Sequence, residues 1–108
     1  MGHFTHYRDH VGANVEKQYK STLFRSGRLM LGLNCLERGQ EQQAHVHADQ
    51  DKFYFVVEGE GAFVVGDETR SASEGMIVWA PAGVSHGVTN NSTTRLVLLV
   101  GIAPFPGK

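Results

Sequence analysis

Short extended segments separated by glycine-containing turns run through most of this chain, and this pattern restricts the fold more than any other feature. From residue 19 to residue 102 the dominant period is two, which is the period of a β-strand, and no stretch has a convincing helical period. Glycine makes up 13 of 108 residues, against a usual share of about 7%, and supplies many of the turns. The sequence therefore predicts an all-β sandwich or barrel.

Eight strands are expected, and they cover residues 19–25, 29–36, 52–57, 62–65, 68–71, 76–80, 85–89 and 94–102. Segment 52–57 carries apolar residues on both faces and is expected to be central, whereas 39–43 is expected to be a polar loop. The length allows one domain. We divide it into an N-terminal arm (1–16), a barrel (17–102) and a C-terminal tail (103–108).

Charge and hydropathy exclude several classes of partner. The formal net charge is −1, which leaves no electrostatic footprint for nucleic acid or an anionic membrane. No apolar run approaches the ~20 residues of a membrane span, and the first ten residues do not resemble a secretory signal. The single cysteine, Cys35, allows no internal disulfide and fits a reducing compartment. We therefore expect a cytoplasmic protein with neither nucleic-acid nor membrane partners.

Three histidines form the candidate metal site. His45 and His47 are two residues apart on a segment predicted to be extended, so both imidazoles should point to one face. His86 begins a later strand, just after a Pro-Ala-Gly turn. Three converging imidazoles would suit Zn, Fe, Cu or Ni and would leave coordination positions open for water or substrate.

The spacing around these histidines resembles the two sequence motifs of the cupin superfamily. In the first motif, Gly39 is followed after five residues by His45-Val46-His47, then by position 52 and Gly59. The second motif is matched in full by Gly75, Pro81, Gly83, His86 and Asn90. The resemblance runs from about residue 29 to residue 102.

The resemblance implies a double-stranded β-helix, or jelly-roll, in which each motif forms a hairpin around a central cavity. It also implies one divalent metal ion (Fe, Mn, Zn, Ni or Cu) held by His45, His47 and His86. The family has a glutamate as a further ligand, and this sequence has Lys52 at that position.

Three interpretations of Lys52 stay open at this point, because an ammonium has no lone pair with which to bind a metal. In the first, the metal has three histidine ligands and Lys52 reaches a substrate anion. In the second, a local bulge turns Asp51 inward as the carboxylate ligand. In the third, the cavity holds no metal and binds an organic anion through Lys52 and protonated histidines.

Two functions are compatible with these residues. The first is a metal-dependent enzyme, similar to dioxygenase or isomerase cupins, that acts on a small organic anion with Lys52 and Tyr54 as candidate catalytic residues. The second is a non-catalytic small-molecule binder or sensor, with or without metal. Gln43, two residues before His45, is also expected to line the cavity. The apolar last strand and the Pro-rich tail lead us to expect a homodimer.

Overall fold

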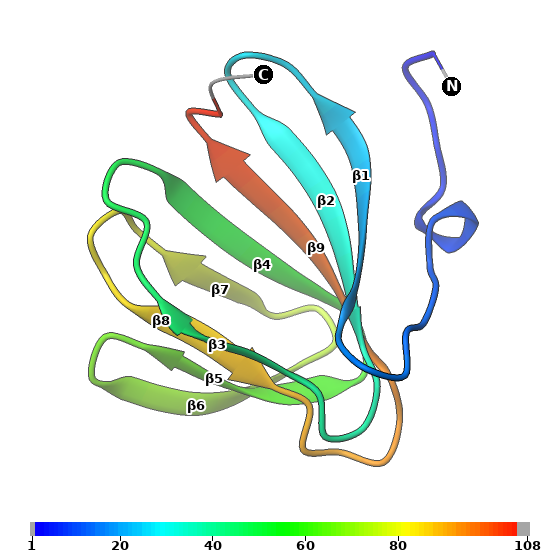
Figure 1. Cartoon of the computed structure of the whole chain (residues 1–108), viewed down its shortest axis with the longest axis vertical. Coiled ribbons are helices and arrows are strands. Elements are labelled where there is room, and N and C mark those ends of the chain that lie inside the picture. The colour runs from blue at the N-terminus through cyan, green and yellow to red at the C-terminus, as the bar shows by residue number, and fades with distance from the viewer. Residues whose placement is uncertain (1, 106–108) are drawn as a thin grey trace.

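The computed structural model describes residues 2–105 and contains nine β-strands and one short 3₁₀ helix (Figure 1). The elements are η1 (Tyr7–Asp9), β1 (Tyr19–Arg25), β2 (Met30–Leu36), β3 (Glu41–His45), β4 (Asp51–Glu58), β5 (Glu60–Val65), β6 (Glu68–Ser73), β7 (Ile77–Ala80), β8 (His86–Thr89) and β9 (Leu96–Ala103). No helix among the described residues is long and apolar enough to cross a membrane.

The strands form two sheets that face each other, as Figure 1 shows. The five-stranded sheet has the order β1-β2-β9-β4-β7, and the four-stranded sheet has the order β3-β8-β5-β6. All strand pairs are antiparallel. The prediction of an all-β jelly-roll barrel is confirmed.

Alternation along β4 shows how the sequence produces the core. Lys52, Tyr54 and Val56 are buried between the sheets, whereas Phe53 and Phe55 point to the outer face and are half-buried. The inward positions of the other strands add the remaining core side chains, which are Leu36, Phe63, Ala72, Ala80, Val88, Leu96, Leu98 and Val100.

One expectation about the strands is confirmed and one is corrected. Strand β4 is an interior strand of the five-stranded sheet, paired with β9 on one side and with β7 on the other, as expected for a segment with apolar residues on both faces. Segment 39–43 is not wholly a loop. Its second half belongs to β3, which pairs with β8 despite its polar sequence.

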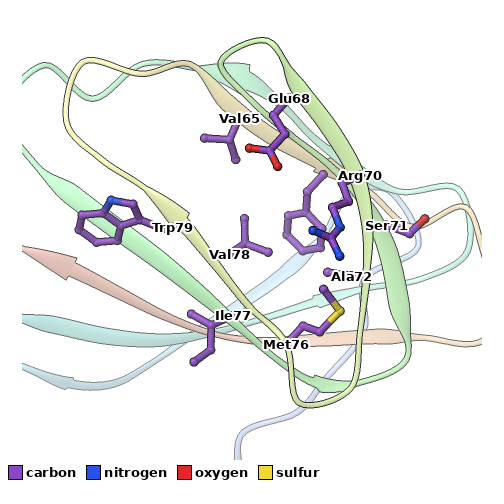
Figure 2. Close-up of a pocket in the computed structure, with 10 residues that line it drawn as sticks. Val65, Glu68, Arg70, Ser71, Ala72, Met76, Ile77, Val78 and Trp79 are labelled. Carbon is purple, nitrogen blue, oxygen red and sulfur yellow. The ribbon is translucent and has the colours of Figure 1, made fainter.

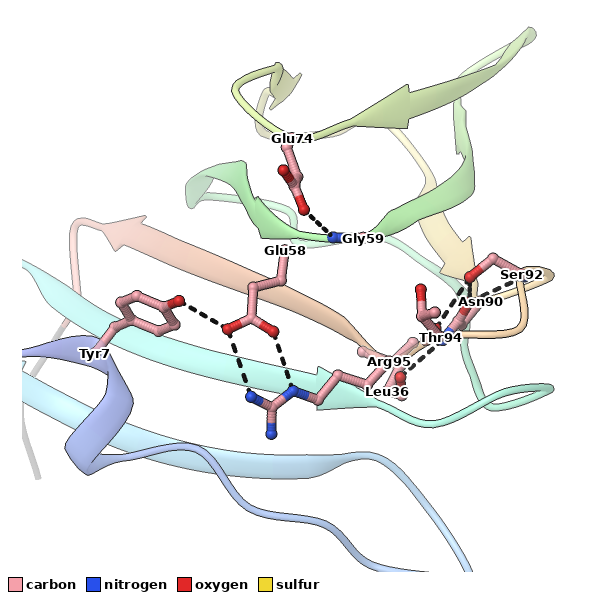
Figure 3. Close-up of polar contacts among 9 residues, drawn as sticks. All are labelled: Tyr7, Leu36, Glu58, Gly59, Glu74, Asn90, Ser92, Thr94 and Arg95. Atoms are coloured by element: carbon pink, nitrogen blue, oxygen red, sulfur yellow. Dashed lines mark hydrogen bonds and ion pairs between the residues drawn. The ribbon is translucent and has the colours of Figure 1, made fainter.

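The N-terminal arm packs on the outer face of the five-stranded sheet. Tyr7 lies against a small apolar cluster formed by Leu33, Cys35 and Val97. Its hydroxyl donates a hydrogen bond of 2.7 Å to Oε2 of Glu58, and the Glu58 carboxylate also pairs with Arg95 at 3.2 Å (Figure 3). The hydrogen bond to Glu58 raises the pKa of Tyr7.

The described part of the C-terminal tail folds back on the same chain. The backbone N–H of Phe105 donates to the carbonyl of Arg28 at 3.1 Å, and the ring of Phe105 lies 5.2 Å from the guanidinium of Arg25. The remainder of the segment assigned to the tail, residues 106–108, lies outside the described residues.

Candidate metal centre

The pairing of β3 with β8 brings the histidines together. His45 is directly opposite His86 in the antiparallel ladder, so the two side chains share a face. His47 follows two residues after His45, and its carbonyl accepts a hydrogen bond of 2.8 Å from the backbone N–H of Gly83, which holds the segment beside the turn before His86. One ligand nitrogen from each imidazole lies within 4.8 Å of the other two.

Backbone carbonyls orient two of the three rings. Nδ1 of His45 lies 2.8 Å from the carbonyl of Gln43, and Nδ1 of His86 lies 3.1 Å from the carbonyl of Val84. A carbonyl can only accept, so these contacts assign the proton to Nδ1 and leave the lone pair on Nε2. This is the arrangement of metal-binding histidines, whose second ring nitrogen is fixed by a hydrogen bond.

The nitrogen atoms that face the centre fit a metal ion. Nε2 of His86 is buried and has no hydrogen-bond partner among the described residues, which is costly unless a ligand satisfies it. Nε2 of His45 lies 3.1 Å from Nε2 of His47, within the roughly 3.0–3.4 Å expected for two imidazoles bound at ~2.1 Å to one ion. Burial lowers the pKa of His47 and of His86, which favours the neutral, ligating form.

Asp51 is not brought into this group. The register of β4 with β9 is continuous from Asp51 to Val56, so the bulge that would turn Asp51 inward is absent. Its side chain is exposed, and its Oδ1 accepts a hydrogen bond of 2.9 Å from the backbone N–H of Ala82. The interpretation of Asp51 as a metal ligand is therefore corrected: it fixes the turn that precedes His86.

Lys52 points into the barrel and is only 4% exposed. Its Nζ donates to Oε1 of Gln42 at 3.1 Å and lies 4.7 Å from the ring centroid of Tyr54. The hydroxyl of Tyr54 donates to the same Oε1. Within residues 2–105, no carboxylate pairs with Lys52. Burial lowers the pKa of its ammonium from the ordinary 10.5 to about 8, and the charge of Lys20 acts in the same direction.

Tyr54 connects this lysine with the histidines. Its ring centroid is 6.3 Å from that of His86, and its side chain is fully buried. Burial raises the pKa of the Tyr54 hydroxyl well above its ordinary value. The hydroxyl is therefore a hydrogen-bond donor at neutral pH.

Gln42 contacts Lys52, and the period-2 alternation of the strand does not identify it. Counting back two positions from His45 selects Gln43, which is exposed, whereas Gln42 is buried and reaches Lys52. The β3–β8 register shifts between Gln42 and His45, and this irregularity reverses which residues face inward. No turn residue in the sequence marks it.

A separate groove of about 300 Å³ lies between β6 and β7, the two strands that end the sheets on this side (Figure 2). Its lining includes the apolar side chains of Phe63, Met76 and Val78 and the charged side chains of Glu68 and Arg70. None of the three histidines lines it.

Comparisons with known proteins agree with this architecture. Residues 32–102 match the cupin domain family. An uncharacterized protein of Streptomyces coelicolor is 39% identical over 80 residues, which are 74% of this chain and 75% of that protein. A crystal structure from Thermus thermophilus is similar with 40% identity and a TM-score of 0.92, over 95% of this chain and 98% of that one. An uncharacterized protein from Klebsiella pneumoniae with a double-stranded β-helix domain has 20% identity and a TM-score of 0.91, over 99% of this chain and 95% of that one.

Proposed function

The chain belongs to the cupin family, and from that premise we propose that it is a metal-dependent enzyme that acts on a small organic anion. His45, His47 and His86 hold one divalent ion, and Lys52 binds the anion. The reaction is of the dioxygenase or isomerase type. A divalent ion at this position supplies Lewis-acid polarisation of a substrate oxygen, or oxygen activation if it is redox-active.

The observation that carries the proposal is the buried Nε2 of His86, which has no hydrogen-bond partner within residues 2–105. It faces two further imidazoles whose ligand atoms lie within 4.8 Å. The lowered pKa of His86 argues against the interpretation in which protonated histidines bind an anion without metal, because that role needs imidazolium.

Lys52 supports the choice of an anion. Three neutral imidazoles do not offset the charge of a divalent ion, and the buried ammonium of Lys52 adds to it. Such a cluster is costly unless an anion compensates it. With a pKa of about 8, Lys52 is mostly protonated at neutral pH and transfers its proton more readily than an ordinary lysine, so it can serve as anchor and as proton donor.

Tyr54 has a positioning role in this scheme. Its hydroxyl donates to Gln42, and Gln42 in turn accepts from Lys52, so the three side chains hold the ammonium in one place. The raised pKa of Tyr54 prevents it from acting as a base at neutral pH.

A second candidate function is a metal-containing binder or sensor without catalysis. The observation that favours it is that neither of the two candidate catalytic side chains is a base at neutral pH, since Lys52 is mostly protonated and Tyr54 is a donor. Proton abstraction would then depend on a group of the substrate itself.

Metal analysis of tag-free protein tests the metal site. We expect about one ion per chain in the wild type and in His3→Ala, a control at an exposed histidine of the arm. His86→Ala should lose most of the metal and keep its circular-dichroism spectrum. Full metal occupancy in His86→Ala would overturn the assignment.

Turnover separates the two candidate functions. Metal-loaded protein is incubated in air with a panel of small carboxylic and hydroxycarboxylic acids, and the mixtures are followed by NMR. Consumption of one acid by the wild type and not by His86→Ala supports the enzyme. Saturable binding of an acid that stays unchanged with each of Fe, Mn, Zn, Ni and Cu supports the binder.

A further inference from the structure

A small pocket next to Lys52 lies on the inner face of the five-stranded sheet and has a volume of about 130 Å³. Its polar lining is Lys20, Ser21, Thr22, Asn34 and Lys52, and its apolar walls include Val100 and Ile102. The ladder explains why these side chains meet: Lys20 is opposite Asn34, and Lys52 is opposite Ile102. We call this the two-lysine pocket.

Among the described residues, two cations line the two-lysine pocket and no carboxylate does. Lys52 is buried and uses one of its three donors, on the neutral oxygen of Gln42. Lys20 is exposed on β1, the first strand of the sheet, and its charge contributes to the lowered pKa of Lys52. The pocket therefore has a surplus of positive charge beside a solvent-accessible edge.

Asn34 adds a neutral amide to the lining. Asn34 is 6% exposed and lines the pocket, but it is not an orphaned buried group: in the described part of the chain, the buried side-chain N and O atoms without a partner belong to Gln18 and His86. Its amide N–H groups can donate to a ligand in the pocket. Two ammonium groups and one amide can together donate to both oxygens of a carboxylate.

We propose that the two-lysine pocket binds the second carboxylate of a small dicarboxylate whose first carboxylate lies at the three histidines. This inference rests on the proposed function, because it places the ligand across the same centre. Tyr54 is next to both ends: its ring centroid is 4.7 Å from Nζ of Lys52 and 6.3 Å from the ring centroid of His86. Lys20 is the residue that distinguishes dicarboxylates from monocarboxylates.

The test compares succinate with butyrate, which has the same chain length and one carboxylate fewer, by calorimetry on zinc-loaded protein. Wild type should bind succinate at least tenfold more tightly than butyrate. Lys20→Gln should lose most of this ratio and keep its zinc affinity. Lys17→Gln is the matched control, since it removes one exposed charge just before β1, and it should retain the ratio. An unchanged ratio in Lys20→Gln overturns the proposal.

A second experiment on metal-free protein distinguishes failure of this pocket from failure of the metal site. Chelator-treated protein is titrated with inorganic phosphate, and Lys20→Gln and Asn34→Leu should each weaken binding at least fivefold, with thermal melting as the check on folding. If the protein binds no metal but phosphate affinity falls in these variants, the pocket stands and the proposed function fails. If metal binds normally and phosphate affinity does not depend on Lys20, the pocket is refuted and the metal site stands.

Discussion

Oε1 of Gln42 accepts a hydrogen bond from Nζ of Lys52 at 3.1 Å, and the hydroxyl of Tyr54 donates to the same oxygen. A neutral amide thus holds a buried ammonium that has no carboxylate partner among residues 2–105. Because an amide oxygen does not neutralise the charge, the ammonium keeps its attraction for an external anion. The residue at position 42 should therefore control anion affinity through its charge.

Gln42→Glu tests this relationship with almost no change in shape. A carboxylate at position 42 should pair with Lys52, raise the pKa of Lys52 toward its ordinary value and compete with an external anion. We expect succinate binding to zinc-loaded protein to weaken at least tenfold by calorimetry. Gln43→Glu introduces the same charge at the exposed neighbour and should have less than a twofold effect. Equal losses in the two variants would contradict the prediction.

The lowered pKa of Lys52 predicts a pH-dependent difference in stability between the wild type and Lys52→Met. The unfolded chain keeps the lysine proton up to about pH 10.5, whereas the folded chain releases it above about pH 8. The charge therefore destabilises the folded state below pH 8, and this cost is relieved as the pH rises from 8 to 10.5.

Urea unfolding of metal-free protein in chloride buffer measures this difference. At pH 7, Lys52→Met should be more stable than the wild type by up to roughly 3.5 kcal/mol, which is the pKa difference converted at about 1.4 kcal/mol per unit. The advantage should shrink steadily between pH 8 and pH 10. A difference independent of pH would show that Lys52 is not desolvated as described.

Lys52→Glu should raise the metal affinity of the site and lower its anion affinity. A carboxylate at this inward position offers a fourth ligand and removes the cation that binds the anion. We expect tighter binding of zinc and weaker binding of succinate, both measured by calorimetry. Lys17→Glu changes the charge by the same amount at an exposed position just before β1 and should alter neither. Weaker zinc binding in Lys52→Glu would be evidence against an inward ligand position.

Much of the fold follows from local rules in the sequence. Period-2 alternation predicts that Tyr54 and Val56 share the inward face with Lys52, and the ladder places them there. The turn role of Asn90 also follows from its residue type: its amide donates to the carbonyl of Thr94, and its Oδ1 accepts from the backbone N–H of Ser92 (Figure 3).

The features that sequence reasoning missed depend on long-range pairing. The register shift between Gln42 and His45 arises where β3 meets β8, a strand far along the chain, and no local pattern encodes it. Lys20 and Asn34 come together with Lys52 only because β1, β2, β9 and β4 are neighbours in that order. The exposure of Trp79 likewise depends on the position of β7 at the end of its sheet.

Substituting alanine for Gly59 and for Gly75 compares how much a side chain at each turn lowers the free energy of unfolding. Both have positive φ, +82° and +90°, so alanine is strained at either position. A Cβ at Gly59 would also overlap the carbonyl oxygen of Arg95, whereas a Cβ at Gly75 would meet nothing within 4 Å. We expect Gly75→Ala to cost about 1–2 kcal/mol in urea unfolding and Gly59→Ala at least ~1 kcal/mol more. Similar costs for both would mean that the Arg95 carbonyl moves freely.

The expected homodimer stays a prediction, but the surface first considered for it changes. Leu96, Leu98 and Val100 of the last strand are buried in the core of their own chain. The apolar residues left exposed on the five-stranded sheet are Ile77 and Trp79 of β7, at 67% and 57%.

These two residues continue an apolar outer face, because Trp79 is opposite Phe53 and Ile77 is opposite Phe55, and both phenylalanines are half-buried. Strand β7 pairs only with β4, so its other edge is also open within the described part of the chain. A contiguous apolar face beside a free strand edge is typical of a protein–protein contact.

Sedimentation at micromolar concentration should therefore give a mass of two chains for the wild type and of one chain for Trp79→Lys. Val15→Lys, which changes an exposed apolar residue of the arm, should remain dimeric. A wild-type mass of one chain would refute the dimer, and a dimeric Trp79→Lys would place the interface elsewhere.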